Sequence, residues 1–335
     1  IASPARKAWL TWGKGFETID RLSESECQGR LRHAYLFTGP SGVGRRTLAL
    51  RFTQAVNCLE PLSPGEPCFS CRACNLIGSL AHPDLSVVQT EEGSSEIRIH
   101  QIRDVQHNLS LTPFEARFRV ALFLRFEEAN PFAASALLKT LEEPPPQVIL
   151  MLTAESSERL LPTIVSRCEV IRLRPIPVDI ISQGLIDFHG VSPDQAQLLA
   201  HLSDGRPGQA IDWHRQPEKL ELRQTLIEDL INLLKGGRID RFAYIQSLAD
   251  DKEKLHLALH IWISFWRDVL LRTSGASTPL TNPDLSEMID MLVSRMSLER
   301  VWLVLSKLNH TSHMLERNIN ARLAAEVLML DLPQL

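Results

Sequence analysis

The sequence predicts an α/β module with a parallel sheet, followed by a region built only of helices. Three observations predict this fold class: a short apolar run leads through a glycine-rich loop into a helical segment, apolar runs alternate with helical segments up to about residue 175, and no convincing strand follows. Continuous apolar runs are typical of parallel strands that are buried on both faces, and helices of ten or more residues between such runs cover the sheet.

The individual elements follow from apolar periodicity and from breaker residues. In the first region we expect strands at 34–37, 85–89, 120–124 and 148–152 and helices at 16–25, 45–58, 97–110 and 131–142. Three prolines at 144–146 end the last of these helices. In the second region we expect helices at 179–189, 193–202, 218–234, 252–271, 284–294 and 297–330. Turn residues at 205–208 punctuate a small helical unit, so the expected domains are 1–175, 176–215 and 216–335.

The overall composition excludes several classes of protein. A chain of 335 residues with 44% hydrophobic content can bury more than one core. Its net charge of −4, from 36 basic and 40 acidic residues, is not that of a protein whose whole surface binds nucleic acid. No segment approaches the roughly 18 apolar residues of a membrane span, so we expect a cytoplasmic protein without membrane contact. The chain begins at Ile1 rather than at Met, so the sequence does not identify its natural N-terminus.

The glycine-rich segment 39–47 has the glycines of a phosphate-binding loop but not its chemistry. Such a loop uses backbone N–H groups to hold phosphates, a Lys to reach the outer phosphates and a Ser or Thr hydroxyl to bind magnesium. Arg45 stands at the Lys position and Arg46 at the hydroxyl position. We therefore favour an inherited turn over residual ATP binding, and catalysis is the least favoured interpretation. The residues that would contact a nucleotide in the binding interpretation are Gly39, Gly42, Gly44, Arg45, Arg46 and Thr47.

Four of the six cysteines are clustered in one short segment, as Cys58, Cys68, Cys71 and Cys74. In a long chain without a secretory signal, closely spaced CxxC pairs favour tetrahedral zinc over disulfides. Reduced thiols or a redox pair are the less favoured alternatives. Because four sulfurs fill the coordination sphere of Zn²⁺, the predicted metal is structural. Cys27 and Cys168 remain as ordinary small side chains.

Several blocks of the sequence resemble those of a known family. They are the run Leu31–Pro40, the four-cysteine insertion after the loop helix, the Leu-Leu-Lys-Thr-Leu-Glu-Glu-Pro-Pro block at 137–145, Ser166-Arg167-Cys168 and, more weakly, the segment 318–323. In this order they resemble the bacterial DNA polymerase III clamp-loader subunits of the AAA+ family, and among these the delta-prime type. The resemblance implies an α/β parallel-sheet P-loop (AAA+) module at 1–175, a small helical lid at 176–215 and an all-α collar for oligomerisation at 216–335.

The resemblance also supplies positions that test for ATPase activity. In the ATPase members, the second core strand ends in carboxylates that orient magnesium and act in catalysis, and this chain has Arg125 at that position. Glu127 and Glu128 come one or two residues late and are expected on the wrong turn. The polar sensor of the next strand aligns with Ala154, and the lid arginine aligns with Gly208, with Arg206 two residues early.

Arg167 is the candidate that the resemblance favours for a catalytic role. AAA+ assemblies place such an arginine in the nucleotide site of the next subunit, where it stabilises charge on the transferred phosphate. The alternative is a solvated surface arginine. The family then implies a catalytically silent stator that supports ATP-dependent loading of the sliding clamp on primed DNA. Its partners would be the delta and tau/gamma subunits in a hetero-pentamer, and through the complex the sliding clamp and primer-template DNA.

Two other functions compete with this interpretation. An ATP-hydrolysing tau/gamma-type subunit would need Lys and Thr at positions 45 and 46 and a carboxylate at 125. A zinc-containing nucleic-acid-binding protein would need a basic face around the cysteines, where only Arg72 lies between them. For the basic residues Arg117, Arg119 and Lys139, contact with a DNA backbone is the less favoured interpretation. Packing is the favoured role of Trp262, Trp266 and Trp302. No catalytic role is expected for His82, His107 and His313.

Overall fold

The computed structural model describes residues 31–63, 65–91, 93–316 and 320–334. These residues divide into two compact units, the first formed by the described residues up to 196 together with 205–209, and the second by 197–204 and the described residues from 210 onward. The division falls inside the expected lid, so the three-part boundaries stay a prediction. The expected helix at 16–25 and Cys27 lie outside the described residues.

The first unit contains a five-stranded sheet in which every pairing is parallel. Its order is β2-β3-β4-β1-β5, with β1 at Ala34–Thr38, β2 at Leu85–Val88, β3 at Arg119–Phe123, β4 at Val148–Ala154 and β5 at Glu169–Arg172. The register sets Thr38 beside Ala154. The strand β5 was not expected, because its exposed Glu169 and Arg172 leave no continuous apolar run.

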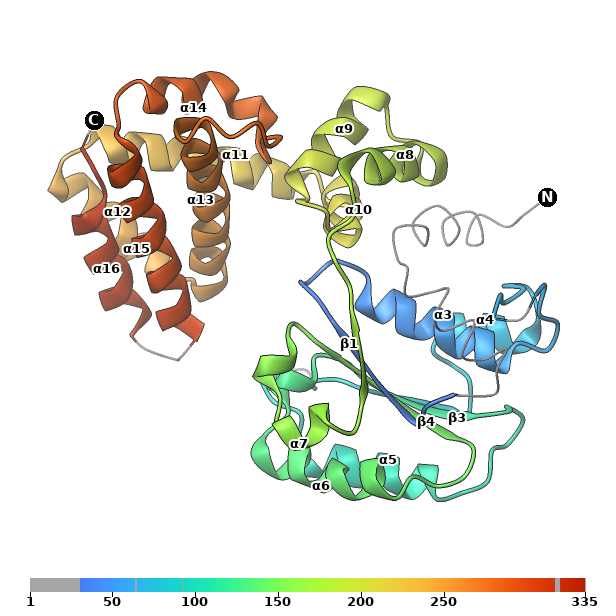
Figure 1. Cartoon of the computed structure of the whole chain (residues 1–335). Helices are drawn as coiled ribbons and strands as arrows, with labels where there is room; N and C mark the ends of the chain where they lie inside the picture. The colour runs from blue at the N-terminus through green and yellow to red at the C-terminus, as the bar shows by residue number, and fades with distance from the viewer. Residues whose placement is uncertain (1–30, 64, 92, 317–319, 335) are drawn as a thin grey trace. The chain divides into compact units, whose positions relative to one another are not determined.

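Helices cover both faces of this sheet (Figure 1). The helices α3 (Arg45–Asn57) and α4 (Arg72–Gly78) lie on one face, and α5 (Ile99–Leu109) and α6 (Pro131–Glu142) on the other. The side chains of β1 alternate accordingly: Tyr35 and Phe37 enter the core with α3, whereas Ala34 and Leu36 enter the core with α5 and α6. The short helix α7 (Pro162–Val165) and α8 (Val178–His189) follow. The helix α4 was not expected inside the cysteine segment.

The helices after α8 begin with α9 (Pro193–Leu202) and α10 (Pro207–Arg215), which straddle the division between the units. The rest of the second unit consists of α11 (Glu218–Lys235), α12 (Arg238–Ala249), α13 (Lys252–Thr273), α14 (Ser286–Val293), α15 (Leu298–Glu316) and α16 (Ala321–Asp331). Trp262 and Trp266 are buried in its core, and the Trp262 indole N–H donates to Leu226 O at 2.8 Å. None of the described helices combines the length and the apolar character that crossing a bilayer requires.

One expectation for the second unit was wrong, and one of its helices was not predicted. The segment 297–330 is not one helix, because α15 ends at Glu316 and α16 begins at Ala321. The Asn320 side chain accepts from Leu323 N at 3.2 Å and so caps α16. The helix α12 was missed because Arg241 takes a buried place in its inner stripe with Ile245 and Leu248. The Arg241 guanidinium donates to Leu233, Leu332 and Pro333 carbonyls, which ties α12 to the end of α16.

Candidate functional site

The glycine loop joins β1 to α3 and keeps a regular turn. Gly39 has φ +150°, and a Cβ there would lie 2.6 Å from the Leu173 carbonyl oxygen, so this position requires glycine. Its N–H donates to the Glu155 carbonyl at 3.1 Å, which fixes the loop to the end of β4. Gly44 is the N-cap of α3 and has φ +107°. The backbone geometry expected from the glycines is therefore present.

The two arginines of the loop have different surroundings. Arg45 is buried, and its Nη1 lies 4.0 Å from Glu127 Oε1 with no hydrogen-bond partner among the described residues. Burial lowers the pKa of Arg45 below its ordinary value, although Glu127 opposes that shift. Arg46 and Thr47 are exposed. The cation at the Lys position thus points into the protein and faces a carboxylate of the same module.

Glu127 faces the loop, so the expectation that it lies on the wrong turn is wrong. The reason is the backbone of Arg125, which adopts a left-handed conformation with φ +50° and turns the chain into a short 3₁₀ segment, Phe126–Glu128. Glu127 Oε1 accepts from Glu155 N at 3.2 Å. The Arg125 side chain itself is exposed and pairs with Glu128 at 3.1 Å.

A pocket of about 450 Å³ opens beside the loop at the carboxyl ends of β3 and β4. Three carboxylates and two guanidinium groups line it, and burial raises the pKa of Glu128. Such a lining presents negative groups where phosphates would approach. The lining residues are Ser41, Arg125, Glu127, Glu128, Glu155 and Arg159.

Two further positions lack the side chains that contact phosphates in ATPase members. Ala154 is fully buried at the end of β4 and carries no polar atom. Gly208 donates its backbone N–H to the Gly42 carbonyl at 2.8 Å, and a Cβ at Gly208 would lie 2.8 Å from the same oxygen. The start of α10 therefore lies directly against the glycine loop, at the place where the resemblance expects an arginine.

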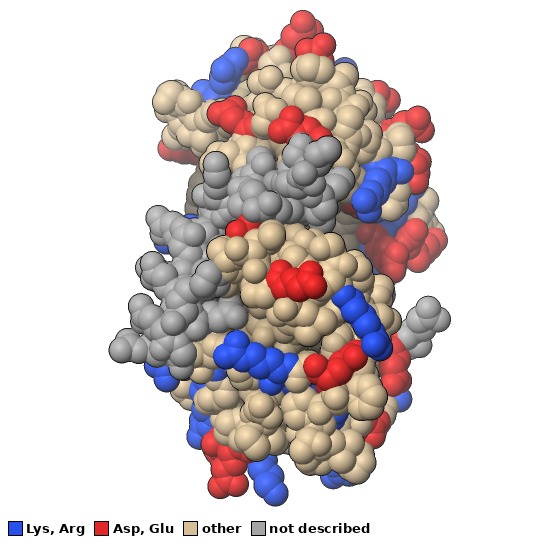
Figure 2. Space-filling model, turned by 90° about the vertical axis from the view of Figure 1, so that its right-hand side faces the viewer, with Lys and Arg blue, Asp and Glu red and all other residues tan. Residues whose placement is uncertain are grey.

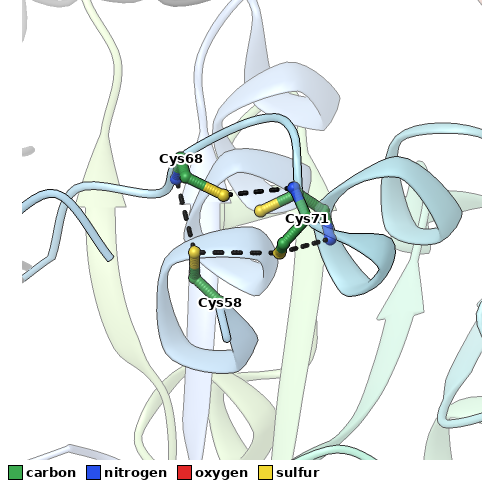
Figure 3. Close-up of side chains that lie close together, drawn as sticks. Cys58, Cys68 and Cys71 are labelled. Carbon is green, nitrogen blue, oxygen red and sulfur yellow. Dashed lines mark hydrogen bonds between the residues drawn. The ribbon is translucent and has the colours of Figure 1, made fainter. Parts of the chain in front are cut away.

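The four clustered cysteines converge between the end of α3 and the start of α4, and Figure 3 shows three of them, Cys58, Cys68 and Cys71. Their sulfurs all lie within 4.8 Å of one another, and Cys58 and Cys71 are 4.0 Å apart. In a tetrahedral site with Zn–S bonds of about 2.3 Å, neighbouring sulfurs are about 3.8 Å apart. The distances between the four sulfurs, and their chemical type, therefore suit the binding of one metal ion by Cys58, Cys68, Cys71 and Cys74.

Backbone N–H groups point at three of these sulfurs. Cys68 N donates to Cys58 Sγ at 3.3 Å, Cys71 N to Cys68 Sγ at 3.2 Å and Cys74 N to Cys71 Sγ at 3.5 Å. Burial alone would raise the pKa of Cys68, but the N–H donors of Ser70 and Cys71 outweigh it and lower that pKa to about 6. Burial raises the pKa of Cys74. Donated N–H groups stabilise thiolates, the form that coordinates metals.

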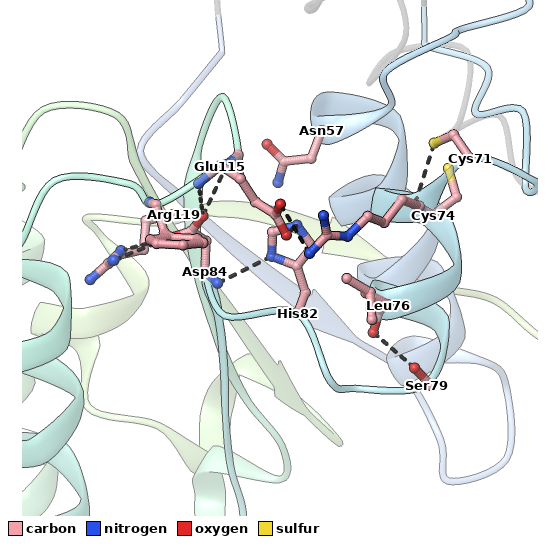
Figure 4. Close-up of polar contacts among 12 residues, drawn as sticks. Asn57, Cys71, Cys74, Leu76, Ser79, His82, Asp84, Glu115 and Arg119 are labelled. Atoms are coloured by element: carbon pink, nitrogen blue, oxygen red, sulfur yellow. Dashed lines mark hydrogen bonds and ion pairs between the residues drawn. The ribbon is translucent and has the colours of Figure 1, made fainter.

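A polar cluster next to the cysteines was not foreseen (Figure 4). The buried Asp84 carboxylate accepts from the backbone N–H groups of Phe114, Glu115 and Ala116 at 2.8–2.9 Å and from Arg119 Nη2 at 3.0 Å. Arg119 is therefore a buried structural residue, and the less favoured interpretation, contact with a DNA backbone, does not fit it. The sequence indicated only a turn at Asp84.

The same cluster connects the cysteine segment to the loop before β3. Arg72 Nη2 lies 3.5 Å from Glu115 Oε2, and His82 Nε2 lies 3.8 Å from Glu115 Oε1. His82 Nδ1 accepts from Asp84 N at 3.1 Å, so the neutral ring carries its proton on Nε2. Burial lowers the pKa of His82. These contacts give His82 a structural place and no catalytic one.

Arg167 follows α7 and lies partly exposed at the edge of the first unit. Its Nη2 donates to Glu142 Oε1 at 2.6 Å, and its Nη1 donates to the Thr163 carbonyl at 2.8 Å. Glu142, the last residue of α6, was not singled out by the sequence, because nothing in its spacing indicates a partner 25 residues away.

Comparison with known proteins identifies the family. The family profile described as "DNA polymerase III, delta subunit" matches residues 16–177, and "DNA polymerase III, delta subunit, C terminal" matches residues 217–334. The DNA polymerase III subunit delta' of Bacillus subtilis is 33% identical over 309 residues, covering 91% of this chain and 92% of the relative. The chain belongs to the delta-prime subunits of DNA polymerase III.

Two further delta-prime relatives are similar to this chain. The subunit of Pseudomonas aeruginosa is 37% identical over 220 residues, covering 63% of this chain and 65% of the relative. That of Escherichia coli is 28% identical over 302 residues, covering 90% and 88%. The resemblance to the delta-prime subunits of DNA polymerase III is confirmed, and so is the expected fold class of a parallel-sheet α/β module followed by an all-helical region.

Proposed function

We propose that this delta-prime subunit is a catalytically silent stator, which supports ATP-dependent loading of the sliding clamp on primed DNA without hydrolysing ATP itself. The observation that carries the proposal is the position of Arg45. In an active loop the cation at this position reaches the outer phosphates. Here it is buried and lies 4.0 Å from Glu127. Arg45, which stands where the phosphate-binding Lys would be, thus pairs with a carboxylate of its own module.

The residues at the neighbouring positions also support the proposal that this chain does not hydrolyse ATP. Arg46 offers no hydroxyl for magnesium, Arg125 replaces a carboxylate, and Ala154 has no polar atom. Gly208 lies with its backbone against Gly42 in place of a lid arginine. Phosphoryl transfer depends almost entirely on positioning and charge stabilisation, so the loss of these groups removes the means of catalysis. The same features argue against the tau/gamma-type alternative.

We propose Zn²⁺ as the metal of the four cysteines, with a structural role. Thiolate donors and a nearly tetrahedral spacing suit Zn²⁺. Because all four ligands come from the protein, no coordination position remains for water or substrate. The ion would fasten the short helix α4 to the end of α3, where Gln54 Nε2 donates to Cys74 O at 2.6 Å. Arg72 is the one Lys or Arg between Cys58 and Cys74, which disfavours a nucleic-acid-binding zinc module.

Arg167 is proposed to act in trans, on ATP bound by a neighbouring ATPase subunit. The delta and tau/gamma subunits of a cytoplasmic hetero-pentamer would be the direct partners, and the clamp and primer-template DNA would be reached through the complex. The second unit supports an oligomerising role, because Leu323, Val327 and Leu330 form an exposed apolar stripe on α16. Trp302, which is 60% exposed on α15, is not a core residue and fits the same role.

The decisive experiment measures ATP binding and hydrolysis by the isolated full chain with magnesium. We expect neither at ATP concentrations that saturate the reconstituted clamp loader, which serves as the positive control. Magnesium-dependent turnover at about 1 to 100 s⁻¹, the range of phosphoryl-transfer enzymes, would contradict silence. Slower turnover that disappears in Gly44→Val, which blocks the left-handed backbone of the loop, would also contradict it.

A further inference from the structure

The guanidinium of Arg167 is already held in one orientation within the isolated chain. Nη2 donates to Glu142 Oε1 at 2.6 Å, and Nη1 donates to Thr163 O at 2.8 Å and to Ser166 Oγ at 3.4 Å. The backbone N–H of Arg167 also donates to Ile164 O at 3.1 Å. Both ends of this long side chain are thus fixed to described elements of the same unit.

The two elements that hold the guanidinium are themselves firmly placed. Glu142 is the last residue of α6, and the following prolines prevent the helix from continuing. Thr163 lies in α7, which packs against α6. The contact therefore joins two elements that are separated by the whole of β4, and it sets the position of Arg167 relative to the sheet.

The contacts leave part of the guanidinium free for another ligand. Arginine carries five N–H donors. The hydrogen bonds described above use two donors on Nη1 and one on Nη2, so Nε–H and the second Nη2–H have no partner among the described residues. Adjacent N–H groups of this kind bind phosphate oxygens as a fork. The side chain is about one third exposed, so an outside ligand can reach it.

We infer that Glu142 is a positioning residue for Arg167: it orients the guanidinium so that its free N–H groups face a phosphate of ATP bound to the adjoining subunit. This inference rests on the proposed trans role of Arg167. Glu142 touches no reacting atom. It acts by restricting the rotamers of Arg167 before the subunits meet, so less conformational freedom is lost when the phosphate binds.

The test uses the complete clamp loader, reconstituted with each variant of this chain, and measures kcat and KM of DNA-stimulated ATP hydrolysis. Glu142→Ala is expected to lower kcat about two- to fivefold, the range set by one exposed ion pair, and to change KM for ATP less than about twofold. Glu142→Gln keeps an acceptor oxygen and should fall between Ala and the wild type. Glu143→Ala is the matched control, since Glu143 is an exposed neighbour whose side chain makes no hydrogen bond or ion pair with the described residues, and it should match the wild type.

A double variant separates this inference from the function on which it rests. Because Glu142 acts through Arg167, Arg167→Ala/Glu142→Ala should be no slower than Arg167→Ala alone. Full activity of Arg167→Ala would overturn the trans role itself. If Arg167→Ala is impaired, then wild-type kcat in Glu142→Ala, a raised kcat, or additive losses in the double variant would each overturn the positioning role alone. Unchanged thermal unfolding of Glu142→Ala is expected, because the pair is exposed.

Discussion

Asp84 is the residue whose removal should cost the first unit most. Its carboxylate accepts three backbone N–H groups and compensates the buried Arg119. Asp84→Asn leaves Arg119 as an uncompensated buried charge, so we expect the free energy of unfolding to fall by about 3 to 5 kcal/mol at pH 7. Urea unfolding measures this value. Asp104→Asn, an exposed change on α5, is the control and should stay within about 0.5 kcal/mol of the wild type.

The same carboxylate predicts a dependence on pH. Burial opposes ionisation of Asp84, but the N–H donors and Arg119 outweigh it, and its pKa lies below the ordinary value. The folded state therefore binds the proton less readily than the unfolded state, so the stabilisation is fully present above the unfolded pKa of about 4 and is lost as the pH falls through the folded pKa. The stability difference between wild type and Asp84→Asn should thus shrink below about pH 4. A difference that does not change with pH would contradict this account.

Arg167 should be replaceable only poorly by lysine. The contacts with Glu142 and Thr163 use the two ends of a planar group, and a phosphate would need further N–H donors in the same plane. We expect Arg167→Lys to recover less than about a tenth of the ATPase activity that the reconstituted complex loses with Arg167→Ala. Steady-state ATPase and clamp-loading assays measure this. Equal activity of the Lys variant and the wild type would show that a point charge suffices.

At the scale of single residues, local patterns were predictable and distant partners were not. Cys58 and the CxxC cysteines stood out because four sulfurs in one short segment are rare. The carboxylate partners of Arg45, Arg167 and Arg119 come from segments 25 or more residues away, and no spacing in one sequence indicates them. Glu127 was misjudged because Arg125 adopts a left-handed backbone and leads into a short 3₁₀ segment, from which Glu127 reaches Arg45.

The cysteine segment, residues 58–74, should depend on its metal for local order. One zinc per chain is expected from elemental analysis of carefully reduced protein. Cys71→Ser should lower the zinc content by more than about tenfold, since it removes a thiolate ligand, while the Ser hydroxyl can still accept from Cys74 N and cap α4. The second unit has its own core, so its helical circular dichroism should survive. Metal-free wild-type protein with an ordered cysteine segment would refute the proposed role of zinc.

The glycine loop should not regain activity from its two motif residues alone. In Arg45→Lys/Arg46→Thr, the Lys and the hydroxyl return, but Arg125, Ala154 and Gly208 still lack the carboxylate and the phosphate contacts. We expect magnesium-dependent hydrolysis to stay more than about a thousandfold below the 1 to 100 s⁻¹ typical of phosphoryl transfer. A turnover assay on the isolated variant measures this. Turnover within that range would mean that the loop alone caused the silence.

At the scale of elements, the buried strands were predicted to within about two residues because parallel strands are apolar throughout. The strand β5 escaped because it lies at the edge of the sheet, next to β1 only, and carries charged side chains. The helix α12 escaped because a buried arginine interrupts its apolar stripe. In each case the element contains charged residues that a local pattern assigns to a loop or to the surface, and contacts with distant parts of the chain stabilise it.

For the whole molecule, we expect weak binding of duplex DNA by the isolated chain. On the face shown in Figure 2, basic and acidic side chains are scattered among neutral ones, and no broad basic area is visible among the described residues. Affinity for DNA comes largely from counterion release at clustered Lys and Arg. Titration at about 0.15 M salt should give a Kd no tighter than the roughly 10⁻⁴ to 10⁻⁶ M of non-specific binding. A nanomolar Kd would mean that the chain carries a DNA site of its own.

The contact between Gly208 and Gly42 also limits the evolutionary routes open to this module. Any side chain at position 208 would bring its Cβ to 2.8 Å from a backbone oxygen of the loop, and a backbone atom cannot rotate away as a side chain can. A lineage could regain a lid arginine there only after the chain at 205–209 had moved away from the loop. That first movement would bring no catalytic gain for selection to retain. The proposed silence is therefore maintained by packing, and mutations that restore single motif residues meet a barrier before they confer any advantage.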